Sequence, residues 1–138
     1  MISRDVINSK IDLIEQNIRL LQELRMQGYE SFSTNYRDIQ AAKHSLQESV
    51  EACLDISNHI IAEKGFRRGE DYKDIFKVIE EEKIISSTLS ARLQEMAQFR
   101  NLLVHQYGKI EIKRLFIIIS EDRKDIEEFV RSILKFIS

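Results

Sequence analysis

The chain is 138 residues long and contains 43% hydrophobic and 32% charged residues, which suits a folded domain and excludes a disordered segment. Its formal net charge of −2 excludes a global basic field that would draw it to polyanions, so any contact with nucleic acid must be local. We therefore expect a single domain over residues 1–138.

Two long helices are predicted in the first half of the chain. The first begins after Ser3, a residue type that caps helices well. Its apolar residues recur at helical steps of three and four: Ile7, Ile11, Ile14, Ile18 and Leu21. The second helix runs from about Ser33 or Thr34 to Lys64, because Gly65 is a favourable residue just beyond a helix end.

The second half of the chain predicts a short helix over residues 72–83 and a longer one capped by Ser86 or Ser87. The last segment is ambiguous, because KIEIKR alternates like a strand and LFIII is continuously apolar. Since no partner strand is evident and helical spacing resumes at Ile126, we assign a helix with a break near Ser120. The expected fold is an all-α antiparallel bundle of four to five helices.

Cysteine and histidine usage gives no sign of a metal centre. The lone Cys53 excludes an intramolecular disulfide and is interpreted as a small core residue. His44 and His59 are too far apart on one helix to share a metal ion, so no metal is assigned. The longest apolar run, residues 115–119, is far short of the about 20 residues that span a membrane, and a cytoplasmic protein is expected.

The segment RNLLVHQYGK, residues 100–109, places candidate catalytic groups near the end of the fourth predicted helix. A polar line on that helix ends with Asn101 and His105, and Arg100 and the small Ala97 lie beside it. On spacing alone, a solvated helix face is the ordinary interpretation. The chemical alternative is that His105 moves a proton while the guanidinium of Arg100 binds a phosphate, with Asn101 in support.

This set of groups suits RNA cleavage in which the ribose 2′-hydroxyl is the nucleophile, so neither a metal nor a protein nucleophile is required. One histidine cannot act as both base and acid in a single concerted step. A two-fold homodimer would supply two Arg–His pairs in one cleft, and Ala97 would permit close approach of the second copy.

The motif Arg100, Asn101, three residues, His105, one residue and Tyr107 resembles that of the HEPN superfamily, and within it the HepT-like toxins. The stretches SLQESVEACLDISNHIIAEKG, DYKDIFKVIEEEKII and LQEMAQFRNLLVHQY extend the resemblance over most of the chain. The resemblance implies a HEPN bundle that dimerises and is a metal-independent endoribonuclease, with Arg100 and His105 of both protomers in a shared cleft.

The same resemblance implies a partner and a mode of control. HepT-like toxins are paired with an MNT-type minimal nucleotidyltransferase antitoxin, usually called MntA, which uses ATP to transfer AMP to the motif tyrosine. In this chain the AMPylated residue would be Tyr107. Bulk and negative phosphates placed beside the cleft would block an RNA phosphate from reaching Arg100.

The turn FRRGEDYKD departs from many relatives of this family because it is more basic and contains no proline. Arg67 and Arg68 are therefore candidate RNA-phosphate contacts, although a helix-connecting turn with two arginines is more often simply solvated. The RNA target, tRNA or mRNA, stays open. Two rival functions are a non-enzymatic helical module that binds a nucleotide or a protein, and a purely structural bundle.

Overall fold

The computed structural model describes residues 1–105 and 111–138, and of residues 103–105 only the backbone. Every regular element in these ranges is a helix. The helices in chain order are α1 (Arg4–Met26), α2 (Tyr29–Ser33), α3 (Tyr36–Lys64), α4 (Tyr72–Glu81), α5 (Ser87–His105), α6 (Ile112–Glu121) and α7 (Arg123–Ile137).

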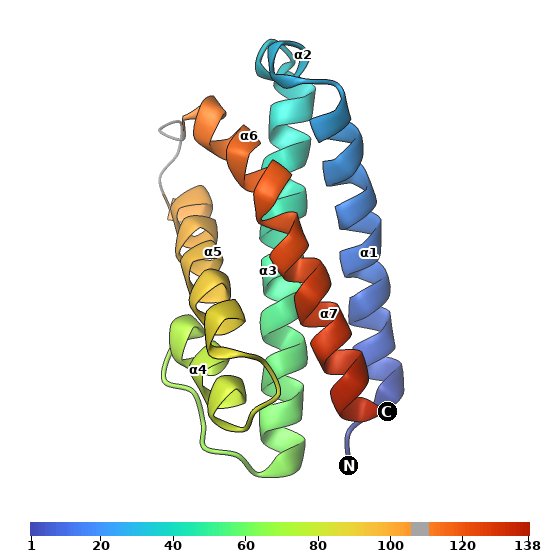
Figure 1. The fold of residues 1–138 in the computed structure, drawn as a ribbon, viewed down its shortest axis with the longest axis vertical. Coiled ribbons are helices and arrows are strands. Elements are labelled where there is room, and N and C mark those ends of the chain that lie inside the picture. Colours follow the sequence, from blue (N-terminus) through green and yellow to red (C-terminus); the bar gives the residue numbers. More distant parts are fainter. Residues whose placement is uncertain (106–110) are drawn as a thin grey trace.

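The long helices form an antiparallel bundle, as Figure 1 shows. Helices α1 and α3 share the most extensive contact, and α5 packs on α3 while α6 and α7 return along α1, α3 and α5. The short α2 covers one end of the bundle, and α4 packs against α5 towards the other end, where both termini lie. The predicted all-α bundle is confirmed, and it contains two further helical segments because of α2 and a break in the last helix.

The first two long helices differ in how well their starts were predicted. Ser3 caps α1 as expected, since its Oγ accepts a hydrogen bond from the backbone N–H of Val6 at 3.3 Å. Helix α3 begins at Tyr36, later than predicted, because the Asn35 side chain caps it by accepting from the Asp38 N–H at 3.1 Å. The serine and threonine that had been assigned as caps belong to α2 and the residue after it.

Two further helix ends follow from local backbone geometry. Gly65 adopts a left-handed φ of 68° directly after α3, which glycine tolerates without steric cost. Helix α4 ends at Glu81, before the predicted residue 83, because Lys83 also has a left-handed φ of 61°. The cap of α5 is Ser86, whose Oγ accepts from the Leu89 N–H at 3.1 Å.

The ambiguous C-terminal segment is helical where the structure describes it. The break predicted near Ser120 lies at Asp122, which separates α6 from α7. Leu115, Ile119 and Phe129 are fully buried on the two sides of this break. Burying such a side chain contributes about 1.5–3 kcal/mol, so these residues help to hold both short helices against the bundle.

The core unites all seven helices. The predicted stripe of α1 is buried along its whole length, and the rings of Phe76 in α4 and Phe129 in α7 meet edge to face at a centroid distance of 6.3 Å. Cys53 is 1% exposed within this core, and burial raises the pKa of its thiol. It is therefore a packing residue, as predicted, and not an ionised nucleophile.

Within residues 1–105 and 111–138, no helix is both long enough and apolar enough to cross a lipid bilayer.

Candidate active site

The predicted site lies on the last two turns of α5. Leu89, Leu93, Met96 and Phe99 face the core and fix the rotation of this helix in the bundle. This rotation leaves Arg100 and Asn101 half-buried at the edge of the core. The guanidinium of Arg114 in α6 lies 5.0 Å from the centroid of the Phe99 ring and so ties the start of α6 to the end of α5.

Ala97 was expected beside the exposed polar line of α5, but it faces the core. It is 1% exposed and is packed inside the monomer, because the core stripe on α5 is wider than the sequence pattern suggested. Ala97 is therefore not part of the polar face of α5. Because it is buried in the monomer, its small size does not help a second copy of the chain to approach.

Arg100 is held by a residue that the sequence pattern did not reveal. Its Nη2 donates a hydrogen bond of 2.6 Å to Oε1 of Glu51, a residue 49 positions earlier in the middle of α3. The same carboxylate oxygen accepts a longer bond of 3.5 Å from Nε2 of Gln47, one turn earlier on α3. The Arg100 and Glu51 side chains are 24% and 42% exposed, so the pair borders solvent.

Several N–H donors of the Arg100 guanidinium have no partner among the described residues. Its Nε is shielded from solvent and has no hydrogen-bond partner among the described residues. Leaving a buried donor unpaired costs about 1–3 kcal/mol, so proteins seldom do so without a reason. The group that an anion could reach is Nη1, which has no hydrogen-bond partner among the described residues, and a planar guanidinium at the edge of solvent is suited to bind an anion such as a phosphate.

Two other predicted site residues lie partly or wholly outside the described part of the chain. His105 is the last residue of α5, and of it only the backbone is described. It follows Arg100 by a rise of about 7.5 Å along the helix axis, at 1.5 Å per residue. Tyr107 lies outside the described residues, so its modification stays a prediction.

Arg67 and Arg68 are in the turn between α3 and α4, at the opposite end of the bundle from the end of α5 (Figure 1). Arg67 is fully engaged within the monomer. Its Nη1 and Nη2 donate to Asp74 at 2.8 and 2.9 Å, and its Nε and Nη2 donate to Glu81 at 2.9 and 2.8 Å. These bonds lower the pKa values of both carboxyl groups, and Arg68 next to them is exposed.

The structure therefore does not bring the two predicted groups of arginines together. Glu51, which holds Arg100, lies about 20 Å along α3 from the end of that helix near Arg67. A phosphate at Arg67 would have to compete with two carboxylates that already occupy its guanidinium.

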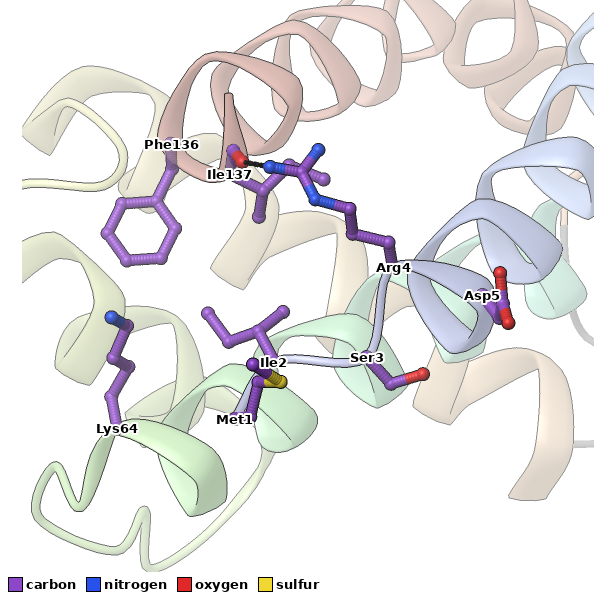
Figure 2. Close-up of a pocket in the computed structure, with 8 residues that line it drawn as sticks. All are labelled: Met1, Ile2, Ser3, Arg4, Asp5, Lys64, Phe136 and Ile137. Carbon is purple, nitrogen blue, oxygen red and sulfur yellow. Dashed lines mark hydrogen bonds between the residues drawn. The ribbon is translucent and has the colours of Figure 1, made fainter.

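A hollow on the described surface lies beside the chain termini, away from α5. Its volume is 660 Å³, and Figure 2 shows Arg4, Lys64 and Phe136 around it. Lys64 lies over the Phe136 ring at 5.9 Å, and Arg4 donates to the carbonyl oxygen of Ile137. Arg100 and Asn101 do not line this hollow, which is shaped by the packing of α7 beside the first residues.

Histidines outside the motif have ordinary roles. Nε2 of His59 accepts from the Ser3 N–H at 3.0 Å, and His44 pairs with Glu48 at 3.5 Å. In the described ranges, no group of three or more His, Cys, Asp or Glu side chains is arranged to hold a metal ion.

The sequence matches the ribonuclease HepT-like family over residues 14–133. It is 27% identical to the mRNA nuclease HepT of Shewanella oneidensis over 126 residues, which cover 91% of this chain and 94% of that protein. It is 23% identical to the tRNA nuclease HepT of Aphanizomenon flos-aquae over 134 residues, which cover 96% of this chain and 90% of that protein.

The fold is similar to a solved structure of a tri-AMPylated Shewanella oneidensis HEPN toxin in complex with its MNT antitoxin. The TM-score is 0.89 at 26% sequence identity, and the superposition covers 96% of this chain and 99% of that one. The similarity thus extends over both the bundle and the helix that carries Arg100.

Proposed function

The chain belongs to the ribonuclease HepT-like family, and from this premise we propose that it is the endoribonuclease toxin of a HEPN/MNT toxin–antitoxin module. The observation that carries the proposal is the state of Arg100. Among the described residues it makes a single hydrogen bond, to Glu51 at the solvent edge of α5, and its Nη1 has no partner there and could donate to a phosphate.

In the proposed reaction, Arg100 binds the non-bridging oxygens of the scissile phosphate. The ribose 2′-oxygen attacks phosphorus and loses its proton to a base, while the bond from phosphorus to the 5′-oxygen breaks and that oxygen takes up a proton. His105 acts as base or acid, and Asn101 orients the imidazole or contacts the substrate. The products are a 2′,3′-cyclic phosphate and a 5′-hydroxyl.

The base and the acid are two different groups in this scheme. We propose that the second histidine comes from a homodimer in which the ends of the two α5 helices face one cleft. The buried Ala97 does not contribute to this contact, so the dimer argument rests on the chemistry and on the exposed polar residues of α5. Because the nucleophile belongs to the RNA, the proposed cleavage needs no metal, and it should continue in the presence of EDTA.

The proposed control is AMPylation of Tyr107 by a cognate MNT-type nucleotidyltransferase. The tyrosine oxygen would attack the α-phosphorus of ATP, form a phosphodiester and release pyrophosphate, with the tyrosine proton going to a base. The name of the Shewanella relative's complex, a tri-AMPylated toxin with MNT antitoxin, supports this assignment. The added AMP groups would repel the RNA phosphate from Arg100 by charge and bulk.

Relatives named as an mRNA nuclease and a tRNA nuclease leave two substrate classes open. We expect the protein to act in the cytoplasm, where both RNA classes are present. Arg68 is the more accessible of the two candidate phosphate contacts in the α3–α4 turn, because Arg67 is already bound by two carboxylates.

The proposal is tested by measuring RNA cleavage and intact mass of the purified protein, with and without the nucleotidyltransferase and ATP. Total RNA, purified tRNA and an mRNA transcript are the substrates, and the native chain is compared with His105→Ala and Tyr107→Phe. Native protein should cleave, His105→Ala should not, and Tyr107→Phe should cleave and resist modification.

Mass increments the size of AMP should accumulate on the native chain and abolish its cleavage, whereas Tyr107→Phe should gain no mass. If native protein cleaves none of the three RNA classes and gains no mass, the enzymatic proposal is wrong. A helical module that binds a nucleotide or a protein partner then becomes the better account.

A further inference from the structure

Glu51 contributes a carboxylate to the candidate site from outside the motif. Helix α5 packs on α3, and this contact brings Glu51 and Arg100 together although 49 positions separate them in the sequence. At 2.6 Å, the bond from Nη2 of Arg100 to Oε1 of Glu51 has the short length of a charge-assisted hydrogen bond.

The contact is poorly suited to a purely structural role. Both side chains reach solvent, and exposed ion pairs contribute little to folding. The bond engages only one nitrogen of the guanidinium and leaves the shielded Nε without a partner among the described residues. Arg67, by contrast, forms two parallel bonds with Asp74.

A one-point contact does have a use in binding a phosphate. An arginine side chain has several rotatable bonds, and in an unrestrained state its guanidinium would sample many positions at the surface. Glu51 fixes one nitrogen, and Gln47 contacts the same carboxylate oxygen at 3.5 Å from the preceding turn of α3. The remaining donors of Arg100 are then held in place before any RNA binds, which lowers the cost of orienting them in the reaction.

We propose that Glu51 is a positioning residue for Arg100, and that its carboxylate holds the guanidinium so that the free donors face the scissile phosphate. This inference rests on the proposed function. Glu51 itself does not touch the reacting atoms, and the property that matters is its hydrogen-bond acceptor at this distance from Nη2.

The test compares variants that keep or remove the acceptor. Glu51→Gln keeps an oxygen acceptor on a side chain of the same shape, and Glu51→Met keeps the length and the helix propensity without a strong acceptor. The matched control is Asp55→Met, one turn later on α3, which removes an exposed ion pair with Lys10 of α1 at 3.0 Å. kcat and KM are measured on one defined RNA, and folding is checked by circular dichroism and thermal unfolding.

We expect Glu51→Met to lower kcat at least about tenfold with KM changed less than about threefold, because the misplaced guanidinium still attracts RNA but supports the reaction poorly. Glu51→Gln should retain kcat within about threefold of the native value, and Asp55→Met should leave both constants unchanged. If Glu51→Met does not fold, Glu51→Ala takes its place.

Native kcat in folded Glu51→Met overturns the inference, and so does a rise in kcat/KM, because it would mean that Glu51 competes with the phosphate. Loss of activity in folded Glu51→Gln also overturns it, since the amide oxygen keeps the acceptor. Arg100→Ala separates the two claims. If it abolishes cleavage while Glu51→Met is native-like, only the role of Glu51 fails; if native protein does not cleave RNA, the proposed function itself fails.

Discussion

Arg67, in the turn at one end of the bundle, and Arg100, level with the middle of α3, use their guanidinium groups in opposite ways. Arg67, in the turn after α3, makes four hydrogen bonds to Asp74 and Glu81. Among the described residues, Arg100, near the end of α5, makes one hydrogen bond, from Nη2 to Glu51, and its Nη1 has no partner.

Exposure alone would have ranked these residues wrongly as binding groups. The Arg67 side chain is 46% exposed and the Arg100 side chain 24%, so Arg67 is easier for an anion to reach. Yet two carboxylates, Asp74 and Glu81, already neutralise the charge of Arg67, whereas one carboxylate, Glu51, contacts Arg100. The number of donors still available, more than exposure, therefore distinguishes an arginine that can bind a phosphate from one that holds a turn together.

The largest effect is expected for Arg100→Lys, which keeps the positive charge but not the planar fork. A lysine can satisfy Glu51 or a phosphate oxygen, but it cannot hold both in a fixed arrangement. We expect cleavage to fall by about 10²–10³-fold, the usual effect of losing one well-placed donor to the reacting group. Initial rates on a defined RNA, taken with a thermal unfolding curve, measure the effect.

The unfolding curve of Arg100→Lys should be close to that of the native protein, because Glu51 and Arg100 lie at the solvent edge. Cleavage within about threefold of native would show that charge alone suffices, and the contrast between Arg100 and Arg67 would lose its meaning for function.

Arg67→Ala is expected to have a smaller effect than Arg100→Lys, and on stability instead of on cleavage. Cleavage per folded molecule should stay within about twofold of native, while the urea midpoint at pH 7 falls, because Asp74 and Glu81 lose their common partner. Arg67 lowers the pKa of both carboxyl groups in the folded state, so its stabilisation is present above their ordinary pKa values of about 4 and is lost as the pH falls further.

Urea unfolding of native and Arg67→Ala protein at pH 7 and pH 4 measures this dependence, and the gap between their midpoints should narrow at pH 4. Arg68→Ala, in the same turn, is the control that changes charge without breaking these bonds. A loss of RNA cleavage in Arg67→Ala that exceeds the loss of folded protein would restore Arg67 as a phosphate contact.

The long helices could be predicted because their information is local. The steps between Ile7, Ile11, Ile14 and Ile18 specify one face of a helix, and all four side chains are buried in α1. Helix α2 was missed because five residues are too few to show a period. The start of α3 was misplaced for a related reason, since Ser33, Thr34 and Asn35 are all good capping residues and packing selects among them.

In the candidate site, too, the residues set by local sequence could be predicted and the residue set by helix packing could not. Arg100 and Asn101 could be identified because their motif lies along a single helix. Glu51 could not, because a contact across 49 positions depends on how α3 and α5 pack. For Arg67 a usable pattern was present: Asp74 and Glu81 are seven residues apart on one helix and thus face the same way, towards the turn that contains the arginine.

The smallest predicted effect concerns Asp122, an acidic residue that, within the described part of the chain, has no hydrogen bond from an arginine such as Asp74 receives from Arg67. Asp122, at the break between α6 and α7, has its pKa raised to about 6, first by burial and then by the nearby Asp125, Glu95 and Glu121. Arg92 bonds to Asp125 at 3.3 Å and only partly offsets the local negative charge. Because the folded state binds the proton more tightly than the unfolded state, ionised Asp122 destabilises the fold above about pH 6, and this cost disappears as the pH falls towards 4.

Replacing this acid by its neutral isostere, Asp122→Asn, should therefore stabilise the protein at pH 7 by about 1 kcal/mol, after discounting for the solvent that still reaches the carboxylate. The gain should vanish near pH 4, and cleavage should not change, since Asp122 contacts neither Arg100 nor Glu51. Asp12→Asn on the exposed face of α1 is the control, for which about zero change is expected. Equal stability of Asp122→Asn and native protein at pH 7 would mean that the Asp122 carboxylate is well solvated. An ionised acid at this position would then cost no stability even without an arginine partner.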